Sequence, residues 1–125
     1  MARILVVDDD DLIRKLVART LERAGYEVVA AADGQQAARQ YRDQPADLII
    51  TDLFMPEKEG MEVIMELRRE DPDVKIIAIS GAGSLGPTGY LEVARMIGAS
   101  KTLAKPFGQE ELLNAVRELL DESET

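Results

Sequence analysis

Short apolar runs alternate along the chain with segments in which apolar residues recur every three or four positions. The runs are rich in Val, Ile, Leu and Ala, which is typical of strands buried in a sheet, and turn residues bound them. The predicted strands are Arg3 to Val7, Tyr26 to Ala31, Leu48 to Asp52, Val74 to Ser80 and Lys101 to Ala104. Each of these candidate strands is followed by a segment with helical periodicity.

The segments after the strands have the apolar stripe of amphipathic helices. The predicted helices run from Leu12 to about Ala24, Gln35 to about Arg42, about Lys58 to Glu70, Tyr90 to Ile97, and from Gly108 into the polar tail at Asp121. Asp10 or Asp11 is suited to cap the first helix, and Gly25 to end it. The residues expected to face the core are Leu12, Ile13, Leu16, Val17, Leu21 and Ala24; Ala37, Ala38 and Tyr41; Met61, Ile64, Met65 and Leu67; and Leu112, Leu113, Val116, Leu119 and Leu120.

Repeated alternation of strand and helix indicates an α/β domain of the doubly wound type. In such domains the strands form a parallel sheet, and right-handed crossovers place helices on both faces. A length of 125 residues corresponds to a single domain. Residues 1–125 are therefore expected to form one domain around a five-stranded parallel sheet.

Composition and charge narrow the function classes. The formal net charge of −9 argues against direct binding of nucleic acid, which clustered Lys and Arg residues hold. The chain has no cysteine, which excludes disulfides and thiol chemistry and fits a reducing cytoplasm. It also has no apolar stretch long enough for a membrane helix, and Met1 leads through Ala2 into a strand instead of a signal peptide. The sequence therefore predicts a soluble cytoplasmic protein without a membrane partner.

Polar side chains stand where the predicted strands end. They are Asp8 and Asp9 after the first strand, Asp52 at the end of the third, Ser80 at the end of the fourth and Lys105 after the fifth. Because the carboxyl ends of parallel strands lie on one edge of the sheet, these groups should share one crevice. Asp10 and Asp11 are instead expected to act on the helix that follows, by capping it and by favourable charge at its N-terminus.

This set of groups suits a metal ion and a phosphoryl group. Carboxylates this close repel one another and should raise the pKa of at least one, and a divalent cation relieves that repulsion. Ligands that are all oxygen, without His or Cys, favour Mg²⁺. Lys105 and Ser80 would neutralise and hydrogen-bond anionic oxygens. Asp52 stands alone whereas Asp8 and Asp9 form a pair, so the layout favours Asp52 as the nucleophile that forms an aspartyl phosphate.

The whole chain resembles the receiver domain of bacterial two-component response regulators. The segments that carry the resemblance are Ile4-Leu5-Val6-Val7-Asp8-Asp9-Asp10, Asp52 to Gly60 with Met55-Pro56, Ser80-Gly81 after Ile76-Ile77-Ala78-Ile79, and Lys105-Pro106-Phe107. The chain is similar to stand-alone receivers of the chemotaxis and sporulation-phosphorelay types, since no output domain follows residue 125. We therefore predict a flavodoxin-like sheet with strand order 2-1-3-4-5.

The resemblance implies a function for each site residue. Asp52 would accept a phosphoryl group from the phosphohistidine of a histidine kinase or of a phosphotransfer protein. Mg²⁺ would be bound directly by Asp9, Asp52 and the backbone carbonyl of Phe54, and through water by Asp8. Ser80 and Lys105 occupy the positions of the switch hydroxyl and the lysine of the family, and the Lys105-Pro106 peptide is implied to be cis. Such a protein is a signalling phospho-acceptor and catalyses only its own phosphorylation and dephosphorylation.

The resemblance also places the output. A downstream protein would bind the face formed by the helix at 90–97, the strand at 101–104 and the final helix. The chain itself would be a monomer or a phosphorylation-dependent dimer. The residues expected to be exposed there are Tyr90, Arg95, Lys101 and Glu111. One position departs from the family pattern: Thr102 stands three residues before Lys105, where the family usually has an aromatic switch residue. Coupling would then depend on Ser80.

Three other functions fit the sequence less well than a phospho-acceptor. A receiver-like interaction module that is never phosphorylated would not need the complete set of acids, hydroxyl and lysine. Phosphatases of the haloacid-dehalogenase type have a second Asp two residues after the nucleophile, where this chain has Phe54. The third alternative is dinucleotide binding, because residues 81–86 spell G-x-G-x-x-G. Against it, this run follows the fourth strand, Pro87 and Gly89 prevent a helix from opening there, and no acid stands about twenty residues further on.

Overall fold

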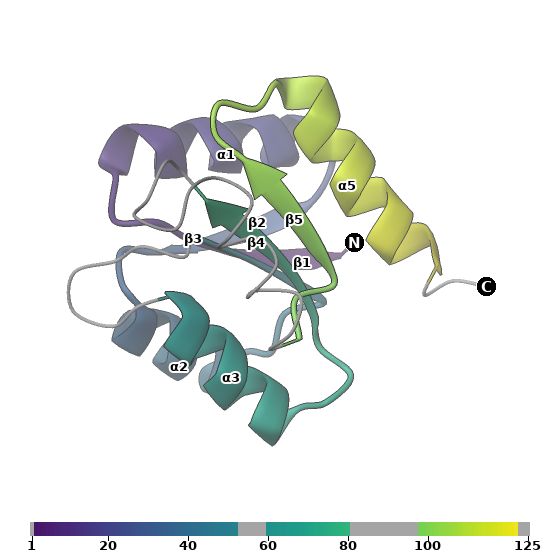
Figure 1. Cartoon of the computed structure of the whole chain (residues 1–125). Coiled ribbons are helices and arrows are strands. Elements are labelled where there is room, and N and C mark those ends of the chain that lie inside the picture. The colour runs from purple at the N-terminus through teal and green to yellow at the C-terminus, as the bar shows by residue number, and fades with distance from the viewer. Residues whose placement is uncertain (1, 53–59, 81–97, 123–125) are drawn as a thin grey trace.

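The computed structural model describes residues 2–52, 60–80 and 98–122 (Figure 1). Its strands are β1 (Arg3–Val7), β2 (Glu27–Ala31), β3 (Leu48–Asp52), β4 (Lys75–Ser80) and β5 (Lys101–Ala104). Its helices are α1 (Asp11–Arg23), α2 (Gly34–Asp43), α3 (Gly60–Glu70) and α5 (Gln109–Glu122). The helix predicted at 90–97 lies outside the described residues. Within the described ranges, no helix combines the length and the apolar character needed to cross a bilayer.

The five strands form one parallel sheet with the order β2-β1-β3-β4-β5. The β3 strand lies at its centre, with Ile50 paired to Val6 on one side and to Ile77 on the other. This confirms the predicted fold class and strand order. The β2 and β4 strands each begin one residue later than predicted, because the backbone N–H groups of Tyr26 and Val74 donate to the turns before them, to Leu21 and Asp71 respectively.

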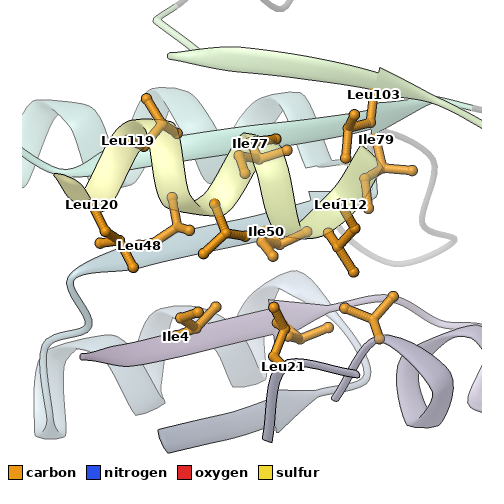
Figure 2. Close-up of a cluster of buried hydrophobic side chains, with 14 residues drawn as sticks. Ile4, Leu21, Leu48, Ile50, Ile77, Ile79, Leu103, Leu112, Leu119 and Leu120 are labelled. Atoms are coloured by element: carbon orange, nitrogen blue, oxygen red, sulfur yellow. The ribbon is translucent and has the colours of Figure 1, made fainter. Parts of the chain in front are cut away.

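Helices cover both faces of the sheet, α1 and α5 on one and α2 and α3 on the other (Figure 1). Alternate residues of each strand point to opposite faces, so the strands supply two apolar layers. On the α1 and α5 side, Ile4, Ile50 and Ile77 form one apolar cluster with Leu21 of α1 and with Leu112 and Leu119 of α5 (Figure 2). On the other side, their neighbours Leu5, Ile49 and Ile76 pack with Ala37, Tyr41 and Leu67 of α2 and α3. Both layers consist almost entirely of aliphatic side chains.

Local signals set the ends of the helices. The Asp10 side chain caps α1 by accepting hydrogen bonds from the backbone N–H groups of Leu12 and Ile13, at 2.9 and 3.3 Å. Gly25 follows the helix with a φ of 99°, in the left-handed region that glycine adopts without strain. Asp33 caps α2 through Gln36 in the same way, at 2.8 Å. The predicted start and stop of α1 are therefore confirmed.

Some residues predicted to face the core lie on the surface instead. The exposed fractions are 67% for Leu12, 54% for Leu16 and 46% for Met65, and Ala24 is exposed as well. In α1 the apolar stripe is two residues wide, and only the row of Val17 and Leu21 faces the sheet. The row of Leu12 and Leu16 is rotated by about 100° from it, one residue step around a helix. The side chains of Met61 and Ile64 lie outside the described part of the chain.

A partly buried hydrogen bond joins α2 to the turn after α3. The hydroxyl of Tyr41, which is 6% exposed, donates to Asp71 Oδ2 at 2.5 Å. Burial and this hydrogen bond raise the pKa of Tyr41, so the neutral hydroxyl remains the donor. We expect Tyr41→Phe to lower the free energy of unfolding by about 1.5–3 kcal/mol, the range for a hydrogen bond to a charged group.

Urea unfolding of the two proteins at neutral pH measures this loss. Tyr26→Phe is the matched control, because Tyr26 is partly buried against the opposite layer. Equal losses in the two variants would show that the bond between Tyr41 and Asp71 contributes nothing specific.

Candidate functional site

Four of the predicted site residues come together at the carboxyl edge of the sheet. Lys105 Nζ donates to Asp52 Oδ2 at 2.9 Å and lies 3.5 Å from Asp8 Oδ2. Carboxylate oxygens of Asp8, Asp9 and Asp52 all lie within 4.8 Å of one another. Asp8 and Asp52 are 2% and 4% exposed, whereas Asp9 is exposed. The edge therefore holds a three-carboxylate cluster with an ammonium group beside it.

The other predicted site residues are only partly described. Ser80 is the last residue of β4 and pairs with Ala104 of β5, so its backbone lies at the same edge, while its side chain is outside the described part. Phe54 also lies outside the described residues. Thr102 pairs with Ala78 in the sheet and is partly exposed. The Lys105-Pro106 peptide is cis, as the resemblance implied.

Burial and opposing charges control protonation in this cluster. Burial raises the pKa of Asp8 and the charge of Asp52 adds to this, while the hydrogen bond from the Asp10 backbone N–H opposes it. Burial alone would lower the pKa of Lys105, but its hydrogen bond to Asp52 and the charges of both carboxylates outweigh that effect and raise it. Lys105 therefore remains a cation, and the unfavourable burial and crowding of negative charge show as the raised pKa of Asp8.

The donor set fits a hard divalent cation. Asp8 Oδ2 is buried and accepts no hydrogen bond among the described residues, and its ion pair with Lys105 Nζ at 3.5 Å compensates only part of the cost of burying a carboxylate oxygen. Three carboxylates from two adjacent strand ends give an all-oxygen site of the kind that Mg²⁺ uses, with room for water ligands on the exposed side of Asp9. A cation here would satisfy Asp8 and relieve the mutual repulsion.

Removal of the charge on Asp8 should stabilise the metal-free protein at neutral pH. The pKa of Asp8 is higher in the folded than in the unfolded chain, so protonation favours the fold. That contribution is complete below the ordinary value of about 3.9 and is lost as pH rises through the raised pKa. In EDTA, Asp8→Asn should therefore melt a few degrees above the wild type at pH 7, with a smaller difference near pH 4.

Thermal melts of both proteins across this pH range measure the difference. Asp73→Asn, at an exposed aspartate in the turn between α3 and β4, is the control for removal of a carboxylate. A difference between Asp8→Asn and wild type that does not grow with pH would contradict the raised pKa.

Sequence reasoning missed one residue beside the cluster. Arg14, in the first turns of α1, donates from Nη1 to the backbone carbonyl oxygen of Asp8 at 2.7 Å, and its Nη2 forms an ion pair with Asp11. Contacts from a side chain to a backbone carbonyl leave no periodic pattern in a sequence. The only available signal was a basic residue soon after the run of acids.

An apolar groove of about 500 Å³ opens beside the cluster, between α1 and α5. The side chains that line it include Ile13, Leu16, Val17, Pro106, Phe107 and Leu112. Lys105 forms part of its wall, so the groove adjoins the three carboxylates. The exposed side of Leu16 therefore belongs to a concave apolar surface next to the site.

Comparisons with known proteins agree with this geometry. Residues 4–117 match the model of the response regulator receiver domain. The chain is 33% identical to the response regulator receiver protein CpdR of Brucella abortus, covering 96% of this chain and 98% of that protein. It is also 33% identical to the chemotaxis protein CheY of Bacillus subtilis, with 95% and 98% covered. A probable transcriptional regulator, ycf27 of Cyanophora paradoxa, is 39% identical, and the chain spans only 49% of its length.

Solved structures show the same fold. A response regulator receiver domain protein from Clostridium thermocellum has a TM-score of 0.91 at 28% identity, with 99% of this chain and 98% of that chain covered. The chemotaxis protein CheY4 of Vibrio cholerae has a TM-score of 0.85 at 34% identity, with 95% and 98% covered. The chain belongs to the receiver domain family of the response regulators of two-component systems.

Proposed function

We propose that this chain is a phospho-accepting switch in which Asp52 takes a phosphoryl group from the phosphohistidine of a histidine kinase or phosphotransfer protein. The observation that carries the proposal is the contact of Lys105 Nζ with Asp52 Oδ2 at 2.9 Å, inside a cluster of three carboxylates. Asp52, on the central strand, is the nucleophile, and Asp8 and Asp9 hold a cation together with it. Residues 1–125 act as a single cytoplasmic receiver domain.

In the transfer step an oxygen of Asp52 attacks the phosphorus atom of the phosphohistidine. The new P–O bond forms as the P–N bond breaks, and the electron pair of the P–N bond leaves with the imidazole. Lys105 already touches the attacking carboxylate, so its ammonium group is placed to donate to phosphoryl oxygens as they arrive. The hydroxyl of Ser80, at the end of the neighbouring strand, would be a second donor.

Mg²⁺ is the proposed cofactor, held by Asp8, Asp9 and Asp52 together with the backbone carbonyl of Phe54. When bound, it supplies positive charge that neutralises the phosphoryl oxygens. The carboxylate oxygens of Asp8, Asp9 and Asp52 already lie within 4.8 Å of one another. The chain thus promotes only its own phosphorylation and dephosphorylation.

The proposed output is a binding event. A phosphoryl group adds a charge of up to about −2 at the end of β3, beside β4 and Ser80. We propose that this change shifts the conformation of the face made by residues 90–97, β5 and α5, and that a downstream protein binds this face. This chain would act there as a monomer or as a phosphorylation-dependent dimer. Thr102 on β5 offers no aromatic side chain for the coupling.

Trapping the phosphorylated residue tests the proposal. Borohydride reduces an aspartyl phosphate to homoserine, so peptide mass mapping after phosphorylation with Mg²⁺ and acetyl phosphate identifies the acceptor. We expect homoserine at position 52. Homoserine at Asp8 or Asp9, or at none of the acids, would overturn the assignment.

We further propose that the phosphohistidine donor docks on the groove between α1 and α5. Its apolar wall includes the exposed Leu16 and adjoins Lys105, and the exposed Leu12 lies one helical turn before Leu16, so a protein seated there reaches Asp52. The paired substitution Leu12→Ser and Leu16→Ser should slow transfer from a phosphorylated kinase by about tenfold or more. Labelling by acetyl phosphate, which needs no docking surface, should be unchanged.

Both rates are measured on one preparation of the variant, with the kinase that labels the wild type fastest as donor. Met65→Ser removes an exposed apolar side chain from α3 on the opposite face and is the matched control. If the kinase labels the doubly substituted protein at the wild-type rate, the groove is not the docking surface.

A further inference from the structure

Arg14 reaches back from α1 over the start of the carboxylate cluster. Its side chain is only 17% exposed, although it lies on a helix whose neighbouring residues Lys15 and Arg19 are exposed. One arm of the guanidinium donates to the Asp8 carbonyl oxygen at 2.7 Å, and the other is held by the carboxylate of Asp11. The guanidinium is therefore fixed between the backbone of one acid and the side chain of another.

The hydrogen bond from Arg14 holds the peptide group that joins Asp8 to Asp9. The carbonyl of Asp8 and the backbone N and Cα of Asp9 belong to one planar peptide group, so holding the carbonyl oxygen holds the whole plane. Other bonds fix Asp8 on either side: its N–H donates to Ala31 at 3.2 Å, and its Oδ1 accepts from the Asp10 N–H at 2.9 Å. The exposed Asp9 side chain starts from this plane.

We propose that Arg14 is a positioning residue of the divalent-cation site, because it fixes the peptide between Asp8 and Asp9 and so aims the Asp9 carboxylate at the cluster. The inference rests on the proposed function, since the cation is Mg²⁺. Arg14 touches neither the cation nor the phosphoryl group in this scheme. Groups that orient metal ligands in this way commonly change metal affinity by about 10- to 100-fold when removed.

For a substitution that removes the Arg14 guanidinium, the loss of charge and the loss of positioning predict opposite changes in Mg²⁺ affinity. Loss of a positive charge near three carboxylates would by itself strengthen the binding of a cation. Loss of the hold on the peptide weakens binding, because Asp9 must then be ordered when the cation arrives. The direction of the change in Mg²⁺ affinity thus separates the two roles.

Isothermal titration of the full chain with Mg²⁺ tests the inference, with Arg14→Gln, Arg14→Lys and the control Arg19→Gln. Arg19 is exposed on the same helix, and its substitution removes the same charge. We expect Arg14→Gln to weaken Mg²⁺ binding about tenfold. Arg14→Lys, which keeps one donor for the Asp8 carbonyl, should recover part of the loss, and Arg19→Gln should bind as the wild type does.

A phosphorylation assay gives the second readout. The Mg²⁺ concentration for half-maximal labelling by acetyl phosphate should rise in Arg14→Gln, while the rate at saturating Mg²⁺ stays close to that of the wild type, because Asp52 is held by β3. Circular dichroism and thermal melts in EDTA establish that each variant is folded before titration.

Three outcomes would overturn the inference. Unchanged or tighter Mg²⁺ binding by Arg14→Gln would refute positioning and leave the proposed function standing. If Arg14→Lys and Arg14→Gln lose Mg²⁺ affinity equally, and both also lose thermal stability in EDTA, Arg14 stabilises the fold and does not position Asp9. A wild-type protein that binds no Mg²⁺ would overturn the proposed function and this inference together.

Discussion

Replacement of Lys105 by methionine is expected to slow phosphorylation by acetyl phosphate about 100- to 1,000-fold, the usual cost of removing one preorganised donor to a developing charge. Lys105 Nζ donates to the attacking carboxylate, at 2.9 Å from Asp52 Oδ2. Methionine keeps much of the length of the side chain and removes the charge and the donors. The rate is measured by intact mass at saturating Mg²⁺.

Lys101→Met is the matched control for this prediction. Lys101 lies four residues earlier and pairs with Glu118 of α5, away from the cluster, so its loss should leave the rate unchanged. Mg²⁺ affinity provides the second check, because Lys105→Met removes a competing cation and should bind Mg²⁺ at least as tightly as the wild type. A fall in rate that follows a matching fall in Mg²⁺ affinity would contradict a role in the transfer step.

Truncation of Ile50 to alanine should lower the free energy of unfolding by about 2–5 kcal/mol. Ile50 is fully buried on the central strand β3, in contact with the layer that α1 and α5 cover (Figure 2). Domains of this size are commonly stable by about 5–15 kcal/mol, so one truncation removes a large share. Urea unfolding monitored by circular dichroism measures the loss.

Two further variants make this prediction specific. Ile50→Val removes a single methyl group and should cost about 0.5–1.5 kcal/mol. Met65→Ala removes an exposed side chain and should stay within about 0.5 kcal/mol of the wild type. A loss below about 1 kcal/mol for Ile50→Ala would be inconsistent with a tightly packed central layer.

Much of the fold could be predicted because burial on both faces makes the strands continuous apolar runs. The run from Leu48 to Ile50 is buried throughout, and the predicted bounds of β3 are those observed. At Tyr26 and Val74 the apolar run extends one residue into a turn, since hydrophobicity does not reveal which partner a backbone N–H takes. Strand order followed from a family resemblance, because periodicity alone fixes no order.

The surface of α1 could not be predicted in the same way. A stripe two residues wide satisfies helical periodicity whether the sheet covers the row of Leu12 and Leu16 or the row of Val17 and Leu21. Only the angle at which the helix lies on the sheet decides, and tertiary packing sets that angle. The structure leaves Leu12 and Leu16 exposed, and Leu16 lines the groove proposed for docking.

The position of the site followed from one rule, and its detail did not. Carboxyl ends of parallel strands meet at one edge, which places Asp8, Asp52 and Lys105 together before any coordinates are known. The same rule does not predict the role of Arg14, which donates from the first turns of α1 to a backbone carbonyl in the preceding loop. Such contacts depend on the path of the loop and become visible only in three dimensions.

The central claim is that Asp52 accepts a phosphoryl group in a reaction that needs Mg²⁺. The most direct measurement is the intact mass of the protein after incubation with acetyl phosphate, with Mg²⁺ or with EDTA, beside Asp52→Asn. We predict a gain of one phosphoryl group for the wild type with Mg²⁺, and none in EDTA or in Asp52→Asn. A folded wild-type protein that gains no phosphoryl group, even from a competent kinase, would contradict the claim and favour an interaction module that is never phosphorylated.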